Sequence, residues 1–486
     1  MKNKLKLFVL LYVLSVLLVS LFSGCVPKHS SLKIDSVTYC PSHTEEGDFV
    51  TFELTIESEK QPPISDYYVF TYIDGNLFNK TKGKQLAKSD KTESLSLIKE
   101  WKALSGKHTV KFVIKAHNKV INTRTITLSV KHVPQGKLVW KLHPGDHSYL
   151  APLVCNDKIV FYSSTTVYCL SPDNGKLLWK RNFITDSDNK NPNGIIATVG
   201  YNRKIYISLH DKGVKKNSAV STLYCLDINN GKTLWKKRIY DGIAFDIRPY
   251  SNNIYVTVFY EDIFGPIPDK TLYCFDSKNG NLIWKKNFYR VGQFPFQAFN
   301  GKLFISVQDK TLSTTYIACF DAKNGALLWK KSVGDLPSLS LSAADNGKLF
   351  FVSSDLDYIT AMDDKGDLMW KKKIINSANY VISAFNGKLY VSALNSFYCM
   401  DERNGNVIWQ YVRKNCDFAS LANGRENLYV RVICRYFDYL LCIDEKTGKL
   451  RWKFSTKDTI SAPVFYNGKV YFGSDNGYAY CVEGGK

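Results

Sequence analysis

Apolar and polar residues alternate with a period of two along most of this chain. In "FVTFELTIES" the apolar positions are Val50, Phe52, Leu54 and Ile56, and the residues between them are mostly polar. Such alternation is typical of strands that bury one face. No amphipathic helical pattern is sustained after the first two dozen residues. The pattern therefore predicts an all-β protein.

The first predicted domain covers residues 31–133. The stretches "YVFTYIDG", "HTVKFVIK" and "TITLSV" also alternate, and the first of them runs into an Asp-Gly turn at Asp74 and Gly75. Short strands with frequent turns predict a small β-sandwich. Together with "GDFVTFELTIES" and "WKALSGKHTVKFVI", they resemble the cell-adhesion-related (CARDB) type of immunoglobulin-like module. That resemblance implies a stalk or an adhesion unit, and a passive spacer is the alternative.

The second predicted domain covers residues 134–486 and is built from repeats. Glycine and tryptophan recur four residues apart, and the Trp-to-Trp spacings are 39, 56, 49, 45, 41, 39 and 43 residues. Repeats of about 40 to 50 residues filled with strands are typical of β-propeller blades. The tryptophans are Trp140, Trp179, Trp235, Trp284, Trp329, Trp370, Trp409 and Trp452.

The two ends of the repeat region complement each other. The strand "GKLVWKL" at 136–142 has no three-strand unit before it, and the three-strand unit that ends at Cys481 has no Trp strand after it. We therefore expect the Trp140 strand to complete the last blade, which would remove a free sheet edge. The prediction is an eight-bladed β-propeller closed by an N-terminal strand clasp. Large indoles at equivalent places are expected to wedge between neighbouring blades.

The repeats resemble a known family. Blades of the form "C-L/F-D-x-x-N-G-x-x-x-W" are similar to the pyrroloquinoline-quinone (PQQ) type repeat with its tryptophan-docking motif. The resemblance implies one of two branches: quinoprotein dehydrogenases, or non-catalytic proteins such as the lipoprotein of the outer-membrane β-barrel assembly machinery. The dehydrogenases hold the quinone with a vicinal cysteine disulfide and a calcium site. This chain has no adjacent cysteine pair and no Cys-x-x-Cys-His, so we expect the non-catalytic branch and no cofactor.

The first 25 residues predict export. Lys2, Lys4 and Lys6 precede an apolar run from Leu7 to Phe22, and small residues lead to Cys25. This segment resembles a bacterial lipoprotein signal, which implies that Cys25 carries lipid and that residues 26–30 form a short tether. Phe22 stands where such signals usually carry leucine, so an uncleaved anchor helix is the alternative. The expected location is the cell exterior or the periplasm.

The formal net charge of +21 comes nearly all from lysine. An export signal precedes the folded part, and arginines do not alternate with aromatics, so nucleic acid is not an expected partner. A solvated surface, attracted to anionic lipid headgroups or acidic cell-wall polymers, is the preferred interpretation.

Cysteine and histidine positions predict little chemistry. Seven of the 12 cysteines occupy one repeat position, which predicts small buried residues and not disulfides or a metal ring. A Cys416–Cys434 bridge within one blade stays open. His143, Asp146 and His147 could bind a metal, but a third ligand at fixed spacing is missing, so no metal is expected. "DSDNKNPNG" at 186–194 is interpreted as a surface turn.

Insertions are where we expect function, because loops that break a repeat usually carry it. "FITDSDNKNPNGIIATVG" and "FYEDIFGPIPDK" account for the two longest spacings. The second contains an apolar and aromatic patch that either packs over a blade edge or contacts a partner. Its residues are Phe259, Tyr260, Ile263, Phe264 and Ile267.

The predicted function is that of an exported, membrane-tethered and non-catalytic scaffold, expected to be monomeric. Its propeller loops would bind an envelope protein or a polysaccharide. One alternative is an enzyme with a site in the propeller funnel, either a quinoprotein dehydrogenase or a hydrolase. The other is a cell-surface adhesion or structural element that acts through the CARDB-like module.

Overall fold

The computed structural model has only β secondary structure in the residues it describes. These are residues 32–40, 44–58, 67–83, 92–96, 99–116, 118–144, 152–184, 192–211, 220–240, 242–259, 270–288, 296–308, 314–334, 339–353, 358–374, 382–393, 395–434, 437–456 and 458–485. Among them no helix is long and apolar enough to cross a membrane. The predicted signal, its Cys25 and the tether lie outside the described residues. The chain divides into two compact units between Val133 and Pro134.

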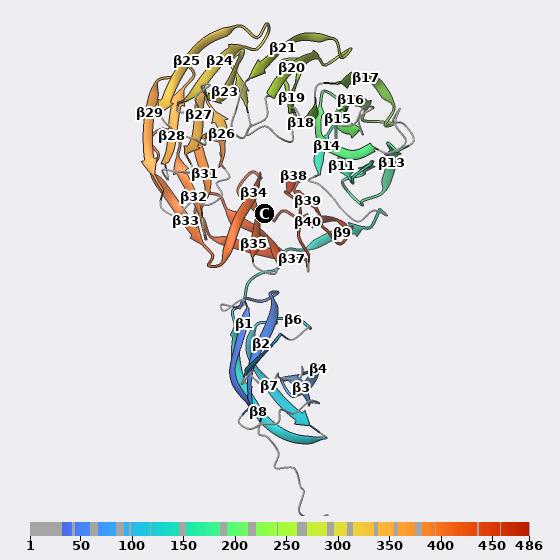
Figure 1. Cartoon of the computed structure of the whole chain (residues 1–486), viewed down its shortest axis with the longest axis vertical. Helices are drawn as coiled ribbons and strands as arrows, with labels where there is room; N and C mark the ends of the chain where they lie inside the picture. Colours follow the sequence, from blue (N-terminus) through green and yellow to red (C-terminus); the bar gives the residue numbers. More distant parts are fainter. Residues whose placement is uncertain are drawn as a thin grey trace, which may run out of the picture. The chain divides into compact units, whose positions relative to one another are not determined.

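The first unit contains two antiparallel sheets (Figure 1). One consists of β1 (Leu32–Cys40), β2 (Phe49–Ser58), β5 (Thr92–Ser96) and β6 (Trp101–Lys102), the last two both pairing with β2. The other has the order β4-β3-β7-β8 and consists of β3 (Tyr67–Ile73), β4 (Asn76–Lys82), β7 (Gly106–Ala116) and β8 (Lys119–Val130). The alternating residues of both sheets meet in one core, where the rings of Phe52 and Phe112 pack edge to face.

The described residues of the second unit form eight four-stranded antiparallel sheets. The first three consist of β10 (Leu153–Cys155), β11 (Lys158–Tyr162), β12 (Thr166–Leu170) and β13 (Leu177–Asn182); β14 (Pro192–Tyr201), β15 (Lys204–Asp211), β16 (Val220–Asp227) and β17 (Thr233–Ile239); β18 (Ile243–Tyr250), β19 (Asn253–Phe259), β20 (Lys270–Asp276) and β21 (Leu282–Phe288). The next two consist of β22 (Gln297–Phe299), β23 (Lys302–Gln308), β24 (Thr315–Asp321) and β25 (Leu327–Gly334); β26 (Leu339–Asp345), β27 (Lys348–Ser353), β28 (Tyr358–Asp363) and β29 (Leu368–Lys373).

The remaining sheets complete a ring (Figure 1). They consist of β30 (Ile382–Phe385), β31 (Lys388–Ala393), β32 (Ser396–Asp401) and β33 (Val407–Val412); β34 (Cys416–Asn423), β35 (Asn427–Cys434), β36 (Asp438–Asp444) and β37 (Leu450–Ser455); β38 (Val464–Tyr466), β39 (Lys469–Gly473), β40 (Ala479–Glu483) and β9 (Leu138–Leu142). In Figure 1 the first strands β14, β18, β26, β34 and β38 face the centre of the ring, and the fourth strands β13, β25, β29 and β33 lie outside. This is the arrangement of a β-propeller.

The last sheet is assembled from both ends of the unit. Strand β9 pairs with β40 so that Trp140 lies opposite Cys481, as the repeat count predicts. Around this ladder, Glu483 N donates to Lys137 O, and Lys137 forms an ion pair with the Glu483 side chain. A strand from the start of the unit thus covers the edge that β40 would otherwise leave open.

The middle strands of each sheet are buried on both faces, which explains their continuous apolar runs. In β12, for example, all five residues from Thr166 to Leu170 are buried. Side chains of adjacent sheets share core clusters, and the cluster around Ile159 and Phe161 includes Tyr471 and Cys481 of the last sheet. The first and last sheets therefore share a core cluster, as other neighbouring sheets do.

The cysteines follow two patterns. Seven of them lie directly opposite the tryptophan of the next strand, as Cys169 does with Trp179, and all seven are buried thiols. In the one sheet without such a cysteine, Ala361 occupies the equivalent position, opposite Trp370. Cys416 and Cys434 face each other across β34 and β35 and form a disulfide.

One boundary differs from the sequence interpretation. Residues 192–194, interpreted as part of a surface turn, belong to strand β14, because the inner strand of this sheet is ten residues long. The longer strand therefore accounts for part of the 56-residue spacing between Trp179 and Trp235. The turn interpretation for 186–191 lies outside the described residues.

Candidate partner-binding face

The ring has two faces, which differ in the connections that form them. The turns between the first and second strands, and between the third and fourth strands, lie on one face, called here the turn face. The connections between the second and third strands, and from each sheet to the next, lie on the opposite face, called here the loop face. This division follows from the antiparallel order of the strands.

On the turn face, the tryptophans bridge neighbouring sheets. The indole Nε1 of Trp179 donates to the backbone oxygen of Ile228 in the next sheet, at 2.8 Å. A Cβ atom on Gly231 would stand 2.7 Å from the ring of Trp179, so glycine is required where the indole packs. The same indole-to-carbonyl bond joins Trp140 to Pro172, Trp235 to Ser277, Trp284 to Ala322, Trp370 to Glu402 and Trp409 to Glu445.

Tyrosines of the second strands reinforce the same junctions. The hydroxyl of Tyr206 donates to Ser277 O at 3.0 Å, the oxygen that also accepts from Trp235. Tyr255 and Tyr471 repeat this contact with Ala322 O and Pro172 O. Burial raises the pKa of Tyr206, which keeps the phenol protonated as a donor.

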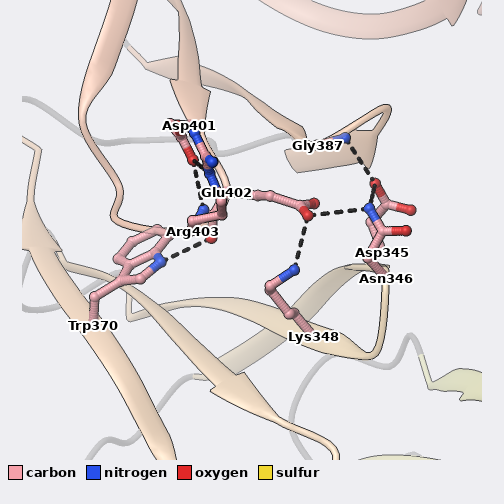
Figure 2. Close-up of polar contacts among 8 residues, drawn as sticks. All are labelled: Asp345, Asn346, Lys348, Trp370, Gly387, Asp401, Glu402 and Arg403. Atoms are coloured by element: carbon pink, nitrogen blue, oxygen red, sulfur yellow. Dashed lines mark hydrogen bonds and ion pairs between the residues drawn. The ribbon is translucent and has the colours of Figure 1, made fainter.

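Lysines at the start of the second strands add a third bond at these junctions. Lys348 Nζ lies 2.8 Å from Glu402 Oε1, and Asn346 Nδ2 donates to the same oxygen at 3.1 Å (Figure 2). Glu402 is only 3% exposed, and its second oxygen, Oε2, is buried without a partner among the described residues. A buried carboxylate with a lysine partner is a feature of many active sites, so the Glu402 cluster is either a catalytic site or a structural contact between sheets.

Equivalent lysine–carboxylate contacts occur at the neighbouring junctions. Lys388 contacts Glu445 Oε1 at 2.7 Å at the next junction, where Tyr390 donates to the same oxygen. Lys302 contacts the Asp364 carboxylate at 2.9 Å at the junction before that of Glu402. Because the same pair of positions recurs around the ring, we interpret the Glu402 cluster as a bond between sheets and not as a catalytic site.

One junction departs from this pattern. Trp329 Nε1 is buried and has no hydrogen-bond partner among the described residues. The turn that follows Ala361 is one residue shorter than its counterparts, so that Asp363 N donates to Asp367 O, whereas Asp321 N donates to Ala326 O five residues on. The equivalent carbonyl, Asp364 O, accepts a hydrogen bond from Lys302 Nζ at 3.2 Å.

The loop face of the third sheet carries side chains that do not recur. The rings of Phe245 and Phe259 have centroids 3.9 Å apart, and Lys270 Nζ stands 4.4 Å from the centre of the Phe259 ring. Lys270 is 4% exposed, and burial lowers the pKa of its ammonium to about 8. A buried lysine over one ring of an aromatic pair differs chemically from the junctions described on the turn face.

Exposed apolar side chains lie at the loop-face ends of neighbouring outer strands. Tyr240, which follows β17, is 67% exposed, and the Arg238 guanidinium lies 5.7 Å from its ring. Ile184, just after β13, is also exposed. Aromatic and arginine side chains are enriched where proteins bind proteins. Together with Phe245, Phe259 and Lys270, they form what we call the loop-face patch.

Several predicted site residues lie outside the described residues: Tyr260, Ile263, Phe264 and Ile267 of the apolar insertion, and Asp146 and His147 of the weak metal candidate. Phe259 is described and belongs to the loop-face patch. His143 is described and packs its ring edge to face on Tyr478. No group of three His, Cys, Asp or Glu residues within the described ranges could hold a metal ion.

Among the described residues near the ring centre, no set of side chains fits a bound quinone of the PQQ type. The disulfide among the described residues joins Cys416 to Cys434, 18 positions apart, and is not a vicinal pair. Asp246, on an inner strand, is held in an ion pair by Arg248 at 2.8 Å. The resemblance implies that a quinone would be held by a vicinal disulfide and by a calcium ion bound to side-chain oxygens. The side chains named here provide neither feature.

A pocket of about 450 Å³ lies on the turn face, between the last two sheets. The pair Tyr429 and Phe465, with stacked rings, forms part of its wall, and Asn427 lines it. Asn427 occupies the position of the junction lysines Lys388 and Lys469, and its Oδ1 is buried without a partner among the described residues. This exchange of lysine for asparagine was visible in the sequence, but the cavity it leaves was not predicted.

Comparison with solved structures shows the same fold. BamB from Moraxella catarrhalis superposes with a TM-score of 0.50 at 15% identity, covering 71% of this chain and 97% of that one. The computationally designed Ika8 protein gives 0.56 at 12% identity, covering 72% of this chain and all of that one. Sqt1 of Saccharomyces cerevisiae gives 0.51 at 12% identity, covering 72% and 100%.

Sequence comparison adds the family. No curated protein matches the chain. The family model described as outer membrane protein assembly factor BamB matches residues 163–290 and 313–431, just over half of the sequence. Those segments cover most of the ring and six of its eight repeat tryptophans, from Trp179 to Trp409. The chain therefore belongs to the family of the outer membrane protein assembly factor BamB.

Proposed function

We propose that this protein is a non-catalytic binding scaffold, exported and tethered to a membrane through lipid on Cys25. Its β-propeller contacts an envelope protein or a polysaccharide through the loop face. The family supports a protein-binding role, since it is named for a factor in the assembly of outer membrane proteins. The partner's identity and the lipid anchor are parts of the proposal.

The observation that carries the proposal is the contrast between the two faces. On the turn face, tryptophan, tyrosine and lysine side chains are engaged in bonds that repeat from sheet to sheet. On the loop face, Tyr240, Phe259 and Lys270 break the repeat. A specific partner requires different groups that converge, which repeated junctions around a ring do not supply.

The proposal also includes two finer points of architecture. Each of the eight sheets is one blade, so that the ring has eight blades closed by β9. The first unit is an immunoglobulin-like module whose two sheets share a core, and it serves as a stalk. The four-stranded sheets and the single core of the first unit support these assignments.

Affinity capture from envelope fractions tests the proposal. The full chain is compared with a loop-face variant (Tyr240→Ser with Phe259→Ser) and with a turn-face control (Asn230→Ser with Lys323→Ser), all four positions being described residues. A component that the full chain and the control retain, and that the loop-face variant loses, is the expected result. A component retained equally by all three proteins, or by none, counts against the loop face as the binding surface.

The non-catalytic part of the proposal has its own test. The protein is incubated with PQQ and calcium and then assayed for dye-linked oxidation of alcohols and sugars. No turnover above that of the free quinone is expected, because the inner strands lack the vicinal disulfide that the enzymes use. Clear turnover would move this chain to the dehydrogenase branch.

A further inference from the structure

The outer face of the sheet β4-β3-β7-β8 in the first unit carries a row of aromatic rings. Tyr68, Phe70 and Tyr72 alternate along β3 with Val69 and Thr71, which are buried in the core. The three rings therefore all lie on the solvent side. Alternate residues of a strand are about 6.8 Å apart, so the rings form a regular line.

Lysines flank this row on both sides. In the strand register, Tyr68 lies opposite Lys82 of β4 and Lys115 of β7, and Phe70 lies opposite Lys80. Tyr72 lies opposite Lys111 of β7. We call these seven residues the Lys–aromatic face. All the charged residues among these seven are lysines.

The ammonium groups are held over the rings. Lys80 Nζ lies 4.2 Å from the centre of the Tyr68 ring and 5.5 Å from that of Phe70, and Lys115 Nζ lies 4.8 Å from Phe70 on the opposite flank. Such cation–π contacts restrict the lysine side chains while leaving hydrogens of the ammonium groups free for an anion. Less side-chain freedom is then lost when an anion binds.

The two outer faces of this unit differ in charge. The outer face of the other sheet carries both signs, because Glu53 and Glu57 alternate with buried residues of β2 and Lys33 of β1 lies opposite Glu57. A merely solvated surface would carry both signs on both faces. The concentration of cations on one flat face, over aromatic rings, therefore indicates a binding surface for an extended anionic ligand.

We propose that the Lys–aromatic face binds an acidic polysaccharide, whose carboxylates meet the lysines while its sugar rings lie along the strand. A membrane surface is the alternative occupant that the experiment tests, because the exposed side chains of Leu77, opposite Tyr72, and Val120, opposite Lys115, lie beside this face. Single-stranded nucleic acid needs open ring faces for stacking, and lysines cover two of the three rings. The inference does not depend on the loop-face patch.

The experiment measures binding of fluorescent polygalacturonate to the full chain by anisotropy, at several salt concentrations. Binding that weakens with salt is expected, with no binding to neutral dextran. The double variant Lys80→Gln/Lys115→Gln should bind at least about tenfold more weakly. The matched control Lys33→Gln/Lys131→Gln removes the same charge from elsewhere in the unit and should change affinity by less than about twofold.

Further arms separate the occupants and the structural effects. Phe70→Leu keeps an apolar residue but removes the ring beneath two ammonium groups, so weaker binding with an unchanged unfolding midpoint is expected. The loop-face variant Tyr240→Ser/Phe259→Ser should bind polygalacturonate as the native chain does. Equal affinity of the Lys80/Lys115 double variant and the native chain overturns the proposal. So does tighter binding to phosphatidylglycerol vesicles or to oligothymidylate than to polygalacturonate.

Discussion

At the scale of single residues, the tryptophan junction combines three contacts. The indole lies opposite a buried cysteine of its own sheet, packs on a glycine of the next sheet, and donates to a carbonyl there. Such a position needs a large aromatic surface for packing and one N–H donor. Among side chains of this size, only tryptophan offers both. The motif therefore serves the fold, and it does not mark a ligand site.

Replacing Trp179 with alanine tests this role. The substitution removes the ring that packs on Gly231 and leaves Ile228 O without its donor. We expect a loss of roughly 3–5 kcal/mol in the free energy of unfolding, measured with urea. Leu178→Ala, at the neighbouring and 46% exposed position, is the control and should cost less than about 1 kcal/mol. An unchanged midpoint for Trp179→Ala would refute the docking role.

Two glycines allow a matched comparison. Gly231 and Gly301 have φ values of 68° and 72°, so an added Cβ strains both backbones alike. A Cβ would collide with Trp179 at Gly231 but would meet nothing within 4 Å at Gly301. Gly301→Ala should therefore cost roughly 1–2 kcal/mol, and Gly231→Ala a further 1–3 kcal/mol or so. Equal losses in the two unfolding curves would show that the indole does not depend on the glycine.

The buried Lys270 should give a pH-dependent stability. Below its folded pKa of about 8, the ammonium is charged in both states and burial penalises the fold. Between that value and its usual 10.5, the folded protein holds the amine neutral while the unfolded chain still binds the proton, so the unfolding free energy rises with pH. Relative to Lys270→Met, the native chain should gain stability as pH rises from 7 to 10. A constant difference across this range would argue against a buried ammonium.

Sequence reasoning reached some of these residues and missed others for physical reasons. The tryptophans and the cysteine position recur at fixed offsets, so a single sequence reveals them. The Lys348–Glu402 contact joins residues 54 positions apart on different sheets, and neither residue is unusual locally. The cation at Lys270 was missed as well, because burial of a lysine depends on its neighbours in space.

At the scale of elements, the pairing of β9 with β40 is the least local feature of the ring. A β-sheet edge left open exposes unpaired donors and acceptors to other chains. The sequence predicts this pairing because every three-strand unit obtains a Trp strand only when the two ends combine. Where a repeat must close, counting its parts is informative even though no local pattern specifies the partner.

Removing β9 tests the closure. A chain that begins at residue 143 should unfold at a lower urea concentration, because it loses the ladder to β40 and the packing of Trp140. It should also self-associate in size-exclusion chromatography through the open edge. A chain that begins at residue 134 keeps β9 and is the control, expected to behave as the propeller does in the full protein. If both truncated chains were equally stable and monomeric, β9 would not be the closing element.

At the scale of the whole molecule, the two units divide the chemistry. The first unit has a face of lysines and aromatic rings, whereas the ring has a face of repeated junctions and a face of individual side chains. The alternation of apolar and polar residues predicts the strands, and the repeat of about 40 to 50 residues predicts the number of sheets in the ring. They do not predict which face differs from its repeat, since that depends on where long connections project.

The central claim is that the partner contacts the loop face. Its most direct test is a photo-crosslinking amino acid at Tyr240 or Phe259, with Asn230 and Lys323 on the turn face as controls, irradiated in intact cells and resolved by mass. We predict one light-dependent adduct of the same partner from both loop-face positions and none from the turn-face positions. Adducts from the turn face alone, or equal adducts from both faces, would contradict it.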